Sequence, residues 1–390
     1  MSLKESLPTG PLLLLLLSLS ACEQEADASA DAQTADGGVV VDAQFPDAET
    51  DPCVPRVLED APVDLQLLGL ADELFAWKTE GGGELWHVVP NGWRFTMPLG
   101  AVFPGVGRLW VRSGDAFVAV DLEGNEVQRV QVDLEGVRME SLAEGDGGRL
   151  VLAGHTGGIS EEQAVVLAHD AQRDEAIWRF DDEAIDGSRT LVSVLLVAAD
   201  GRVYALGTFF PSADPQETFL LSFSPEGDRL TVDVAHEIAG VALVESGGQV
   251  FVFGHRQGQP AIAPFGDVAG PVVAPPVPAG FEYVTPHRIW AMPDGWLMVM
   301  DLRGGDGVAG QPFTATWVVR TDSAGEVLWD RQYADSAAQD SAFQSAALAG
   351  DRLHLLTRAA SPDAAGPPDR QVALDLAGGC QVAPRLIFSR

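Results

Sequence analysis

Residues Gly201–Leu230 have the sequence GRVYALGTFFPSADPQETFLLSFSPEGDRL, which shows the chain's repeating unit most clearly. It begins with a glycine turn and an alternating apolar segment that ends in Gly-Thr. A proline-containing loop, a second apolar segment and a Pro-x-Gly turn follow. Apolar alternation between turn residues predicts antiparallel β-strands that are joined by short connections.

The first half of this stretch recurs seven times along the chain, at intervals of 35 to 56 residues. Each copy combines a short turn with an alternating apolar strand. The copies are DELFAWKT (from Asp72), GRLWVRSG (Gly107), GRLVLAGH (Gly148), GRVYALGT (Gly201), GQVFVFGH (Gly248), GWLMVMDL (Gly295) and DRLHLLTR (Asp351). A repeat of this length is the size of one β-propeller blade.

A second apolar unit follows each copy, and its two strands are joined by a turn that contains Asp or Gly. The clearest example is TWVVRTDSAGEVLWDRQY, from Thr316. In such turns Asp accepts backbone hydrogen bonds and Gly adopts positive φ. A further alternating stretch precedes each copy, such as LVSVLLVAA from Leu191. Four strands per repeat predict an all-β fold, a seven-bladed β-propeller of four-stranded antiparallel blades, over residues 53–390.

Some segments depart from this pattern. The second unit of blade five, AIAPFGDVAGPVV from Ala261, is degenerate and rich in proline, and blades one and two are weakly marked. The segment Asp335–Leu348, DSAAQDSAFQSAAL, is the one short stretch compatible with a helix. We interpret it as a loop followed by a strand.

The hairpin units resemble bacterial seven-bladed β-propeller repeats and the related quinoprotein-like propeller repeats. The resemblance is strongest in Gly201–Leu230 and covers most of residues 60–390. It implies the fold and says almost nothing about function. Turns of the form Asp-x-x-Gly-x-x-x-Trp resemble those of quinoprotein dehydrogenases, but the vicinal cysteines and the eighth blade of those enzymes are missing. We therefore expect no cofactor.

The N-terminus has the pattern of a secretory signal, with the apolar run LLLLLLSLSAC from Leu12 to Cys22. This run is too short to span a bilayer as a mature helix. Its last four residues, LSAC, resemble the bacterial lipobox. The resemblance implies a signal peptide over residues 1–21, cleavage before Cys22 and a lipid on the Cys22 thiol. The alternative is an ordinary signal peptide with a chance cysteine.

Residues 22–52 have the composition of a tether that follows the lipidated cysteine. Between Glu23 and Pro52 there are nine acidic residues and no Lys or Arg. Such a segment buries too little apolar surface to fold, so we expect it to be disordered. As a flexible coil it would reach roughly 30 Å. We expect a monomeric, lipid-anchored protein of the cell envelope, on the periplasmic side or at the cell surface.

The charge balance argues against one class of partner. The chain has 57 acidic residues against 24 Lys and Arg, and its net charge is −33. Binding to a phosphate backbone needs clustered basic residues, so we expect no nucleic-acid partner.

Two cysteines remain once Cys22 is assigned to the lipid, and they lie at the two ends of the folded region. In an exported protein, Cys53 and Cys380 suggest a disulfide. The alternative is two free thiols. A covalent link here would join the first and last blades.

The loops that follow the second strand of each blade emerge on one face, and they are the longest in the repeat. Loops on a rigid scaffold are the usual place for binding, so this face is the predicted ligand surface. The alternative is that long loops are merely tolerated there. The candidate ligand residues are His155, Thr208, His255, Asp301, Asp306 and Arg358.

No metal site is expected on this face. His155 and His255 fall at equivalent repeat positions, but zinc or iron needs three or four ligands. The segment Asp301–Gly307, DLRGGDG, lacks the alternating oxygen ligands of a calcium loop.

No catalytic residue is predicted, because the chain has no G-x-S-x-G, H-E-x-x-H or P-loop motif. We expect a non-enzymatic binding or scaffold protein for an envelope protein or polymer. One alternative is an outer-membrane assembly scaffold, by analogy of fold and anchor with the propeller lipoprotein of the β-barrel assembly machinery. Another is a hydrolase or lyase of a surface polymer, with carboxylates such as those of Asp181–Ala184.

Overall fold

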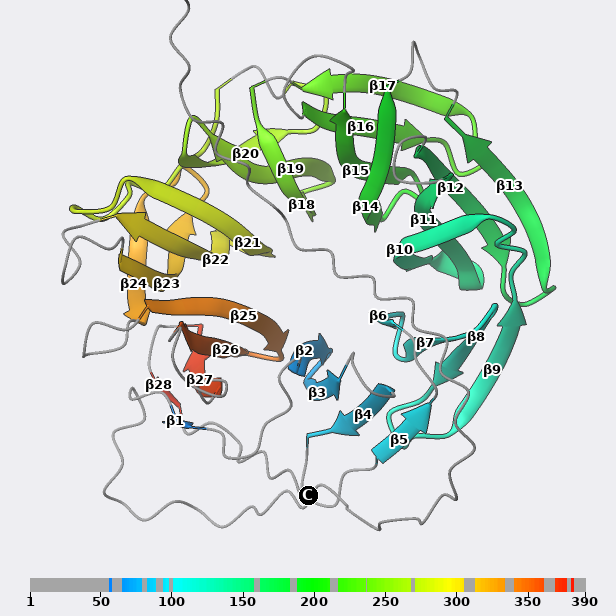
Figure 1. Cartoon of the computed structure of the whole chain (residues 1–390), viewed down its shortest axis with the longest axis horizontal. Helices are drawn as coiled ribbons and strands as arrows, with labels where there is room; N and C mark the ends of the chain where they lie inside the picture. The colour runs from blue at the N-terminus through cyan, green and yellow to red at the C-terminus, as the bar shows by residue number, and fades with distance from the viewer. Residues whose placement is uncertain are drawn as a thin grey trace, which may run out of the picture. The chain divides into compact units, whose positions relative to one another are not determined.

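Seven antiparallel sheets surround a common axis, in the order in which they occur along the chain (Figure 1). The structure is a computed structural model that describes residues 56–57, 65–78, 83–88, 94–97, 101–157, 162–182, 188–210, 217–235, 237–267, 271–304, 313–333, 340–360, 369–376 and 380–381. The chain divides into two compact units, Met1–Asp36 and Gly37–Arg390, and every described residue belongs to the second. The predicted seven-bladed β-propeller is confirmed for this unit.

The first four blades have four strands each, in chain order. Blade one contains β2 (Leu65–Leu70), β3 (Glu73–Lys78), β4 (Gly83–His87) and β5 (Arg94–Met97). Blade two contains β6 (Val102–Pro104), β7 (Leu109–Ser113), β8 (Ala116–Val120) and β9 (Glu126–Gln131). Blade three contains β10 (Val137–Gly145), β11 (Arg149–Thr156), β12 (Gln163–Asp170) and β13 (Glu175–Asp181). Blade four contains β14 (Arg189–Val197), β15 (Val203–Phe210), β16 (Glu217–Phe223) and β17 (Arg229–Ala235).

The last three blades differ in their outer strands. Blade five contains only β18 (Ala239–Ser246), β19 (Gln249–Arg256) and β20 (Gln259–Pro264) among the described residues. Blade six contains β21 (Tyr283–Met292), β22 (Gly295–Gly304), β23 (Phe313–Asp322) and β24 (Val327–Tyr333). Blade seven contains β25 (Asp340–Ala349), β26 (Arg352–Ala360) and β27 (Asp369–Asp375), with β1 (Arg56–Val57) and β28 (Cys380–Gln381) at its outer edge.

Every quoted copy of the repeat forms the second strand of its blade, so the assignment of the repeat to strands is confirmed. The strand predicted within Asp335–Leu348 is β25, which begins at Asp340; residues 335–339 lie outside the described residues. The only helical element in the described part of the chain is the 3₁₀ turn Asp146–Gly148. No helix there is long and apolar enough to cross a membrane.

Burial changes from the middle to the outside of each blade. All five residues of β8 are buried, whereas the outermost strands β9 and β13 are largely exposed. A middle strand is covered on both faces by the neighbouring blades, so it needs a nearly continuous apolar sequence. This explains runs such as AFVAV, from Ala116, in which alternation with polar residues disappears.

The hydrophobic core lies between blades, at interfaces that we call seams. One core cluster joins Val151 and Val166 of blade three to Val203 and Phe219 of blade four. Because the seams form the core, each blade is held mainly by its two neighbours, as in other repeat architectures.

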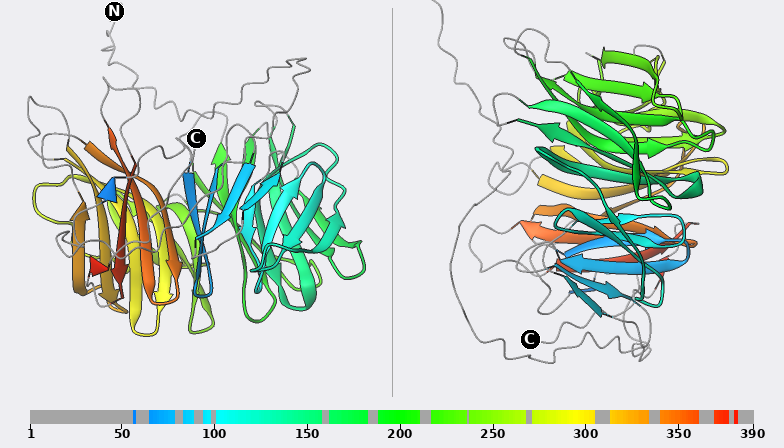
Figure 2. Two further views of the ribbon diagram at one scale, coloured as in Figure 1. Left: turned by 90° about the horizontal axis from the view of Figure 1, so that it is seen from below. Right: turned by 90° about the vertical axis from the view of Figure 1, so that its right-hand side faces the viewer.

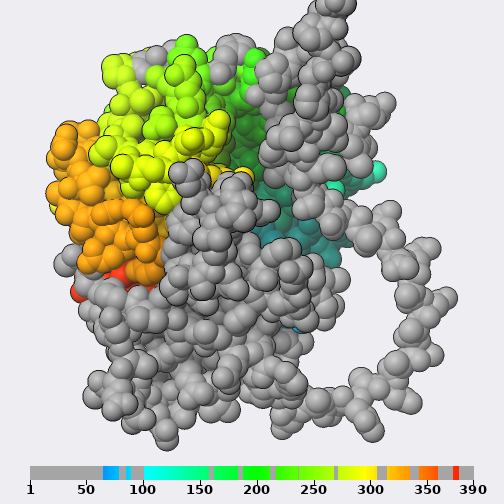
Figure 3. Space-filling view, turned by 60° about the vertical axis from the view of Figure 1, so that its left-hand side comes forward, coloured from blue at the N-terminus to red at the C-terminus, as the bar shows by residue number. Residues whose placement is uncertain are grey.

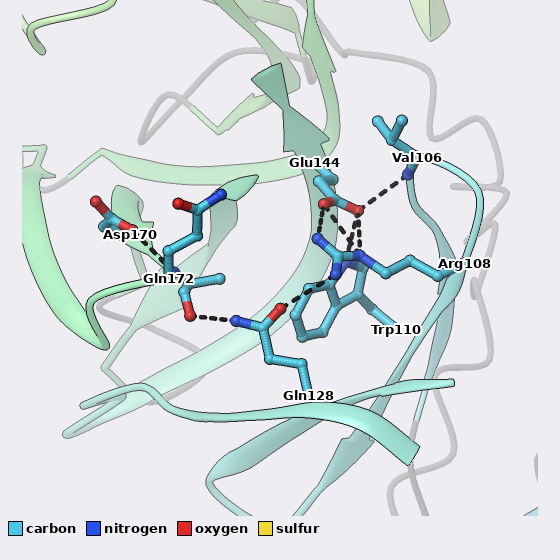
Figure 4. A network of polar contacts seen from close by, with 8 residues as sticks. Val106, Arg108, Trp110, Gln128, Glu144, Asp170 and Gln172 are labelled. Atoms are coloured by element: carbon cyan, nitrogen blue, oxygen red, sulfur yellow. Dashed lines mark hydrogen bonds and ion pairs between the residues drawn. The ribbon is translucent and has the colours of Figure 1, made fainter. Parts of the chain in front are cut away.

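The seam between blades two and three also contains a polar network (Figure 4). The Glu144 carboxylate of β10 accepts hydrogen bonds from the Trp110 indole (2.8 Å) and the Val106 backbone N–H (2.9 Å), and it pairs with the Arg108 guanidinium. Arg108 also donates to Gln128 (3.1 Å). Glu144, whose side chain is only 2% exposed, thus connects blade three to three residues of the β6–β7 region of blade two.

The predicted turn chemistry is confirmed between the third and fourth strands. The Asp121 carboxylate accepts the backbone N–H groups of Glu123 (3.0 Å) and Asn125 (2.8 Å), and Gly124 has a φ of 87°. The hydrogen bond from the Asn125 backbone is the largest cause that lowers the pKa of Asp121. Asp322 makes the same turn in blade six.

The degenerate sequence of blade five explains its missing outer strand. The proline-rich segment 271–280 makes a single bridge to β20, between Val273 and Ile262, with both N–H···O distances at 2.9 Å. Proline has no N–H to donate, so this segment cannot extend the ladder. It covers the edge of the blade instead, and Pro275 is buried.

The two ends of the folded unit meet on blade seven. Arg56 of β1 pairs with Gln371, and Cys380 of β28 pairs with Leu374, on the same edge of β27. The outermost strand of this blade is thus shared by the N-terminal and C-terminal segments, an arrangement that the sequence did not predict. Cys53 lies outside the described residues.

Side chains also close the seam between blades seven and one. The Leu67 backbone N–H donates to Ser345 Oγ (2.9 Å), and the Gln344 side chain donates to the Leu65 carbonyl oxygen (2.9 Å). The ring of seven blades is therefore continuous.

Antiparallel pairing gives the ring two different faces. The strands of each blade run between these faces (Figure 2). The second and fourth strands end on one face, which we call the loop face, and the tight turns such as Asp121–Asn125 lie on the other, the hairpin face. The loop face is the predicted ligand surface.

Candidate functional site

Five of the six candidate residues occupy one structural position, repeated around the loop face. Each lies near the end of the second strand of its blade. Each is paired with an inner-strand residue that lies two positions before the extra residue of a β-bulge. These pairs are His155–Arg138, Thr208–Leu191, His255–Ala239, Asp301–Thr285 and Arg358–Ala342. The predicted equivalence of His155 and His255 is confirmed, while Asp306 lies outside the described residues.

The bulges add one residue to the inner strands of blades three to seven. Bulges re-aim side chains and are common beside functional sites. The extra residues are Glu140, Ser193, Val241, His287 and Gln344.

Asp301 lies inside β22 and is 4% exposed, rather than at the start of a surface loop as the sequence suggested. Its carboxylate accepts hydrogen bonds from Thr316 Oγ1 (2.9 Å) and from the Phe343 backbone N–H (3.0 Å). Because Phe343 belongs to blade seven, Asp301 joins two blades. A carboxylate with these partners is a structural connection across the seam.

His287, which the sequence did not single out, completes this cluster. Its Nε2 lies 3.1 Å from Asp301 Oδ2, and its ring stacks on Phe343 with centroids 4.3 Å apart. The side chain of His287 is 23% exposed. A buried carboxylate that orients a partly exposed imidazole is the arrangement that general-base catalysis uses.

His155 is buried at the seam between blades three and four. Its Nε2 lies 3.9 Å from a carboxylate oxygen of Glu162, which also pairs with Arg189 at 3.1 Å. The Arg189 guanidinium lies over the Phe210 ring, 4.4 Å from its centre. His155 is therefore a seam residue and not an exposed loop residue.

A cavity of about 270 Å³ opens at the seam between blades four and five. Two predicted candidates, Thr208 and His255, line it; His155, Asp301 and Arg358 do not. The remaining lining residues come from four strand ends and two connections. They are Gly207, Glu217, Thr218, Ala235, Glu237, Ile238, Ala239, Gly240 and Gln257. Figure 3 shows the green and lime side chains of these two blades next to one another on the surface.

A threonine fixes the two blades at the wall of this cavity. Thr218 Oγ1 of β16 donates to the Ile238 carbonyl oxygen (2.5 Å) and accepts the Gly240 backbone N–H (2.9 Å). A Cβ on Gly240 would lie 2.8 Å from side-chain carbons of Leu206 and Val252, so glycine is needed for this close approach. The cavity is thus bounded by rigid strand ends.

The ionisable groups of the cavity are two glutamates and a histidine. Burial lowers the pKa of His255 below its usual value of 6.5, so its imidazole is neutral at pH 7. Glu237 pairs with the Arg256 guanidinium at 3.4 Å, and its side chain is 58% exposed. Glu217 contributes a second carboxylate from the start of β16. No Lys or Arg is among the described lining residues.

The sequence did not point to Glu217, Thr218 and Glu237, because they lie in other parts of the repeat than the candidates. Glu217 starts the strand that follows the proline loop, and Glu237 lies just before the next blade. Only the seam brings them together with His255. The available signal was that Glu217 starts a strand and Glu237 lies in a connection on the same face.

No group of three or more His, Cys, Asp and Glu among the described residues is placed to hold a metal ion. His155 and His255 belong to different seams, and only His255 lines the cavity.

No protein-family model matches this chain, and no curated protein matches its sequence. Solved structures match in fold. The β-propeller domain of the Trilobed protease from Pyrococcus furiosus, described as having an open velcro topology, aligns with a TM-score of 0.51 and 8% identity, over 82% of this chain and 98% of that chain.

Two further solved structures align similarly. Pyrococcus horikoshii acylaminoacyl peptidase gives a TM-score of 0.53 at 10% identity, over 82% of this chain and 52% of that chain. A polysaccharide lyase, an ulvan lyase bound to -[GlcA(1-4)Rha3S]-, gives a TM-score of 0.51 at 8% identity. The alignment covers 84% of this chain and 96% of that chain. At these identities the likeness shows the fold alone: the chain is a seven-bladed β-propeller.

Proposed function

We propose that this protein is a lipid-anchored, extracytoplasmic β-propeller that binds a ligand in the cavity between blades four and five. The observation that carries this proposal is the cavity itself. It lies on the face predicted from the sequence, is lined by two of the predicted residues, and is bounded by rigid strands from two blades. Sites on rigid scaffolds hold ligands with little loss of conformational entropy.

The anchor is proposed from the sequence, since Cys22 lies outside the described residues. The lipobox-like LSAC and the acidic tether support it. Cys22→Ser should release the protein from membranes into the soluble fraction. A variant that stays with the membrane would contradict lipidation.

Binding is tested with the purified full-length protein in detergent, by a thermal-shift screen of amines, short peptides and oligosaccharides. A ligand at 100 times its Kd stabilises the folded state by about 2.7 kcal/mol. Ala239→Phe fills the cavity from an exposed strand end and should abolish the shift. Ala199→Phe, an exposed position on the hairpin face of blade four, is the matched control and should leave the shift unchanged. Ligands that stabilise Ala239→Phe as well as the parent would contradict the proposal.

A second candidate function, a hydrolase or lyase of a surface polymer, is favoured by the His287–Asp301 pair. In that case His287 is the proton acceptor and Asp301 the residue that orients it. Turnover of a polysaccharide panel should be lost in His287→Gln. It should be kept in His169→Gln, which removes a similar His–Asp pair (3.0 Å, to Asp174) from the hairpin face. Asp301→Ala is a poor test, because it also removes the connection between blades six and seven.

A further inference from the structure

We propose that Arg288 and His287, on the inner strand of blade six, bind an oxyanion: a carboxylate, phosphate or sulfate group of a ligand. Neither residue lines the cavity between blades four and five, so this site goes beyond the proposed function. It concerns the binding of a ligand beside His287 and does not depend on catalysis there. The inference is carried by a charged side chain that has no partner among the described residues.

The seven inner strands surround the axis of the ring (Figure 1). Nearly all of their described charged side chains have a partner within the protein. The partners form the pairs Arg138–Glu140 (3.5 Å), Glu144–Arg108 and Arg189–Glu162 (3.1 Å), and the Glu245 carboxylate accepts the Ala199 backbone N–H (2.9 Å). Arg288 of β21 is the exception among the described inner-strand side chains, because it has neither an ion pair nor a hydrogen bond.

The surroundings of Arg288 leave its positive charge uncompensated. Arg288 is exposed to solvent, and yet protein lies close enough around its guanidinium to affect the charge. Burial lowers the pKa of Arg288, and no carboxylate nearby raises it again. The guanidinium still stays protonated at pH 7, because the ordinary pKa of arginine lies far above that value. A bound oxyanion would supply the missing negative charge.

A β-bulge places His287 on the same face of the sheet as Arg288. Along β21, Ile289 packs against the core between blades five and six, and Trp290 against the core between blades six and seven. Because side chains alternate, Arg288 faces blade seven. Regular alternation would turn His287 the other way, but His287 is the extra residue of the bulge, and its ring stacks on Phe343 of blade seven. The two adjacent residues therefore reach the same seam.

His287 adds a polar group that is held in place beside the cation. Its Nε2 lies 3.1 Å from Asp301 Oδ2, so Nδ1 is the ring nitrogen that remains for a ligand. A protonated imidazole donates from both nitrogens, here to Asp301 and to a bound anion. The charge of Asp301 is already met by other donors, Thr316 Oγ1 and the Phe343 backbone N–H.

The chemistry of this pair selects anions that have at least two oxygens. The planar guanidinium of Arg288 can donate two parallel N–H···O bonds to a carboxylate, a phosphate or a sulfate. Such charge-assisted hydrogen bonds are shorter and stronger than neutral ones. A neutral group of the same shape would leave the positive charge uncompensated, so we expect it to bind more weakly.

The test is isothermal titration of the full-length protein in detergent, at constant ionic strength, with malonate, inorganic phosphate and sulfate. Malonamide has the shape of malonate without its charge and is the neutral control. We expect at least one anion to bind, and its affinity to fall about tenfold or more in Arg288→Gln. The three probes distinguish a carboxylate ligand from a phosphate or a sulfate ligand.

Further variants test the second residue and the location. His287→Leu should weaken the same anion about threefold, because the donor at Nδ1 is lost. Arg149→Gln is the matched control, at an arginine without a described partner on the hairpin face of blade three, and it should bind like the parent. The unfolding temperature of Arg288→Gln should equal or exceed that of the parent, because the substitution removes an uncompensated charge.

Several results would overturn the inference. Absence of anion binding, or equal affinities of the parent and Arg288→Gln, would show that Arg288 does not bind an anion. Malonamide binding as tightly as malonate would show that charge does not select the ligand. An unchanged affinity in His287→Leu would remove His287 from the site. A lower unfolding temperature of Arg288→Gln would contradict an uncompensated charge.

The cavity variant Ala239→Phe separates this inference from the proposed function. If anion binding is lost in Ala239→Phe and kept in Arg288→Gln, the anion binds in the cavity, and the inference fails while the proposed function stands. If Arg288→Gln loses the anion while no ligand depends on the cavity, the inference stands and the proposed function fails.

Discussion

Single side chains that cross the seams hold neighbouring blades in register. Thr218 connects blade four to blade five, Asp301 connects blade six to blade seven, and Glu144 connects blade three to blade two. In each case a side-chain oxygen accepts a backbone N–H of the neighbouring blade. Removing one partner leaves a buried polar group unpaired. The resulting loss of folding free energy is larger than the net contribution of the hydrogen bond itself.

We expect the fold to lose stability when the Glu144 carboxylate loses its charge. Burial alone would raise the pKa of Glu144, but hydrogen bonds from Arg108, Trp110 and the Val106 N–H outweigh burial and lower it. The stabilisation is therefore present above the ordinary pKa of 4.5 and is lost as the pH falls through the lowered value. Glu144→Gln should lower the free energy of unfolding by about 2–3 kcal/mol at pH 7, measured by denaturant titration.

The control for Glu144 is Glu126→Gln, which removes a surface ion pair with Arg129 whose side chains are 50% and 43% exposed. It should change stability little, because exposed pairs are screened by water. Equal effects of the two substitutions would refute the role assigned to Glu144.

Because of His354, we expect the folded state to be less stable in mild acid. It is 5% exposed, and burial, with a smaller effect of Arg352, lowers its pKa from 6.5 to about 4. The unfolded chain binds the extra proton first, so stability falls as the pH drops from 6.5 towards 4. Between pH 7 and pH 5 the free energy of unfolding should fall by about 2 kcal/mol less in His354→Leu than in the parent protein. Thermal unfolding at both pH values measures this difference. An unchanged pH dependence would contradict this assignment.

At the level of strands, β1 and β28 both pair with β27, and the disulfide between Cys53 and Cys380 stays a prediction from the sequence. Arg56 pairs with Gln371, three residues from Leu374, the partner of Cys380. Cys53 itself lies outside the described residues.

Mass mapping of the non-reduced protein should yield a peptide in which Cys53 and Cys380 are joined. Reduction should lower the unfolding temperature, because the link closes a loop of more than 300 residues, for which the stabilisation is on the order of 5 kcal/mol at most. A Cys53→Ser variant should show no further change on reduction. Alkylation of both thiols without reductant would contradict the link.

The strands were predictable because their signals are local. GRVYALGT and its relatives all became second strands, and Asp121 and Asp322 formed the expected turns. The weak outer edge of blade five also followed from its prolines. The sharing of the last blade by β1 and β28 was not predictable, since two-residue strands carry no periodic signal.

The site was only half predictable for a related reason. Thr208 and His255 were found because they repeat at one position of the unit. Glu217 and Glu237 were missed because their proximity depends on how two blades pack. Asp301 was predicted at a loop start, but β22 continues to Gly304 and buries it.

For the whole molecule, the point at which the ring closes is distant from the candidate cavity. Both ends of the folded unit meet at blade seven, whereas the cavity lies between blades four and five. In the chain order of Figure 1, these blades lie on the far side of the ring from the point of closure.

Hydrogen exchange locates the ligand site on the blades. It is measured by mass spectrometry on the full-length protein, with and without a ligand that gives a thermal shift. We predict slower exchange in peptides that cover Gly207–Thr208, Glu217–Thr218 and Ile238–Gly240 on the loop face. Peptides that cover the Asp121–Asn125 and Asp322–Glu326 turns on the hairpin face should be unaffected. Protection confined to other blades, or to the hairpin face, would contradict a ligand site between blades four and five.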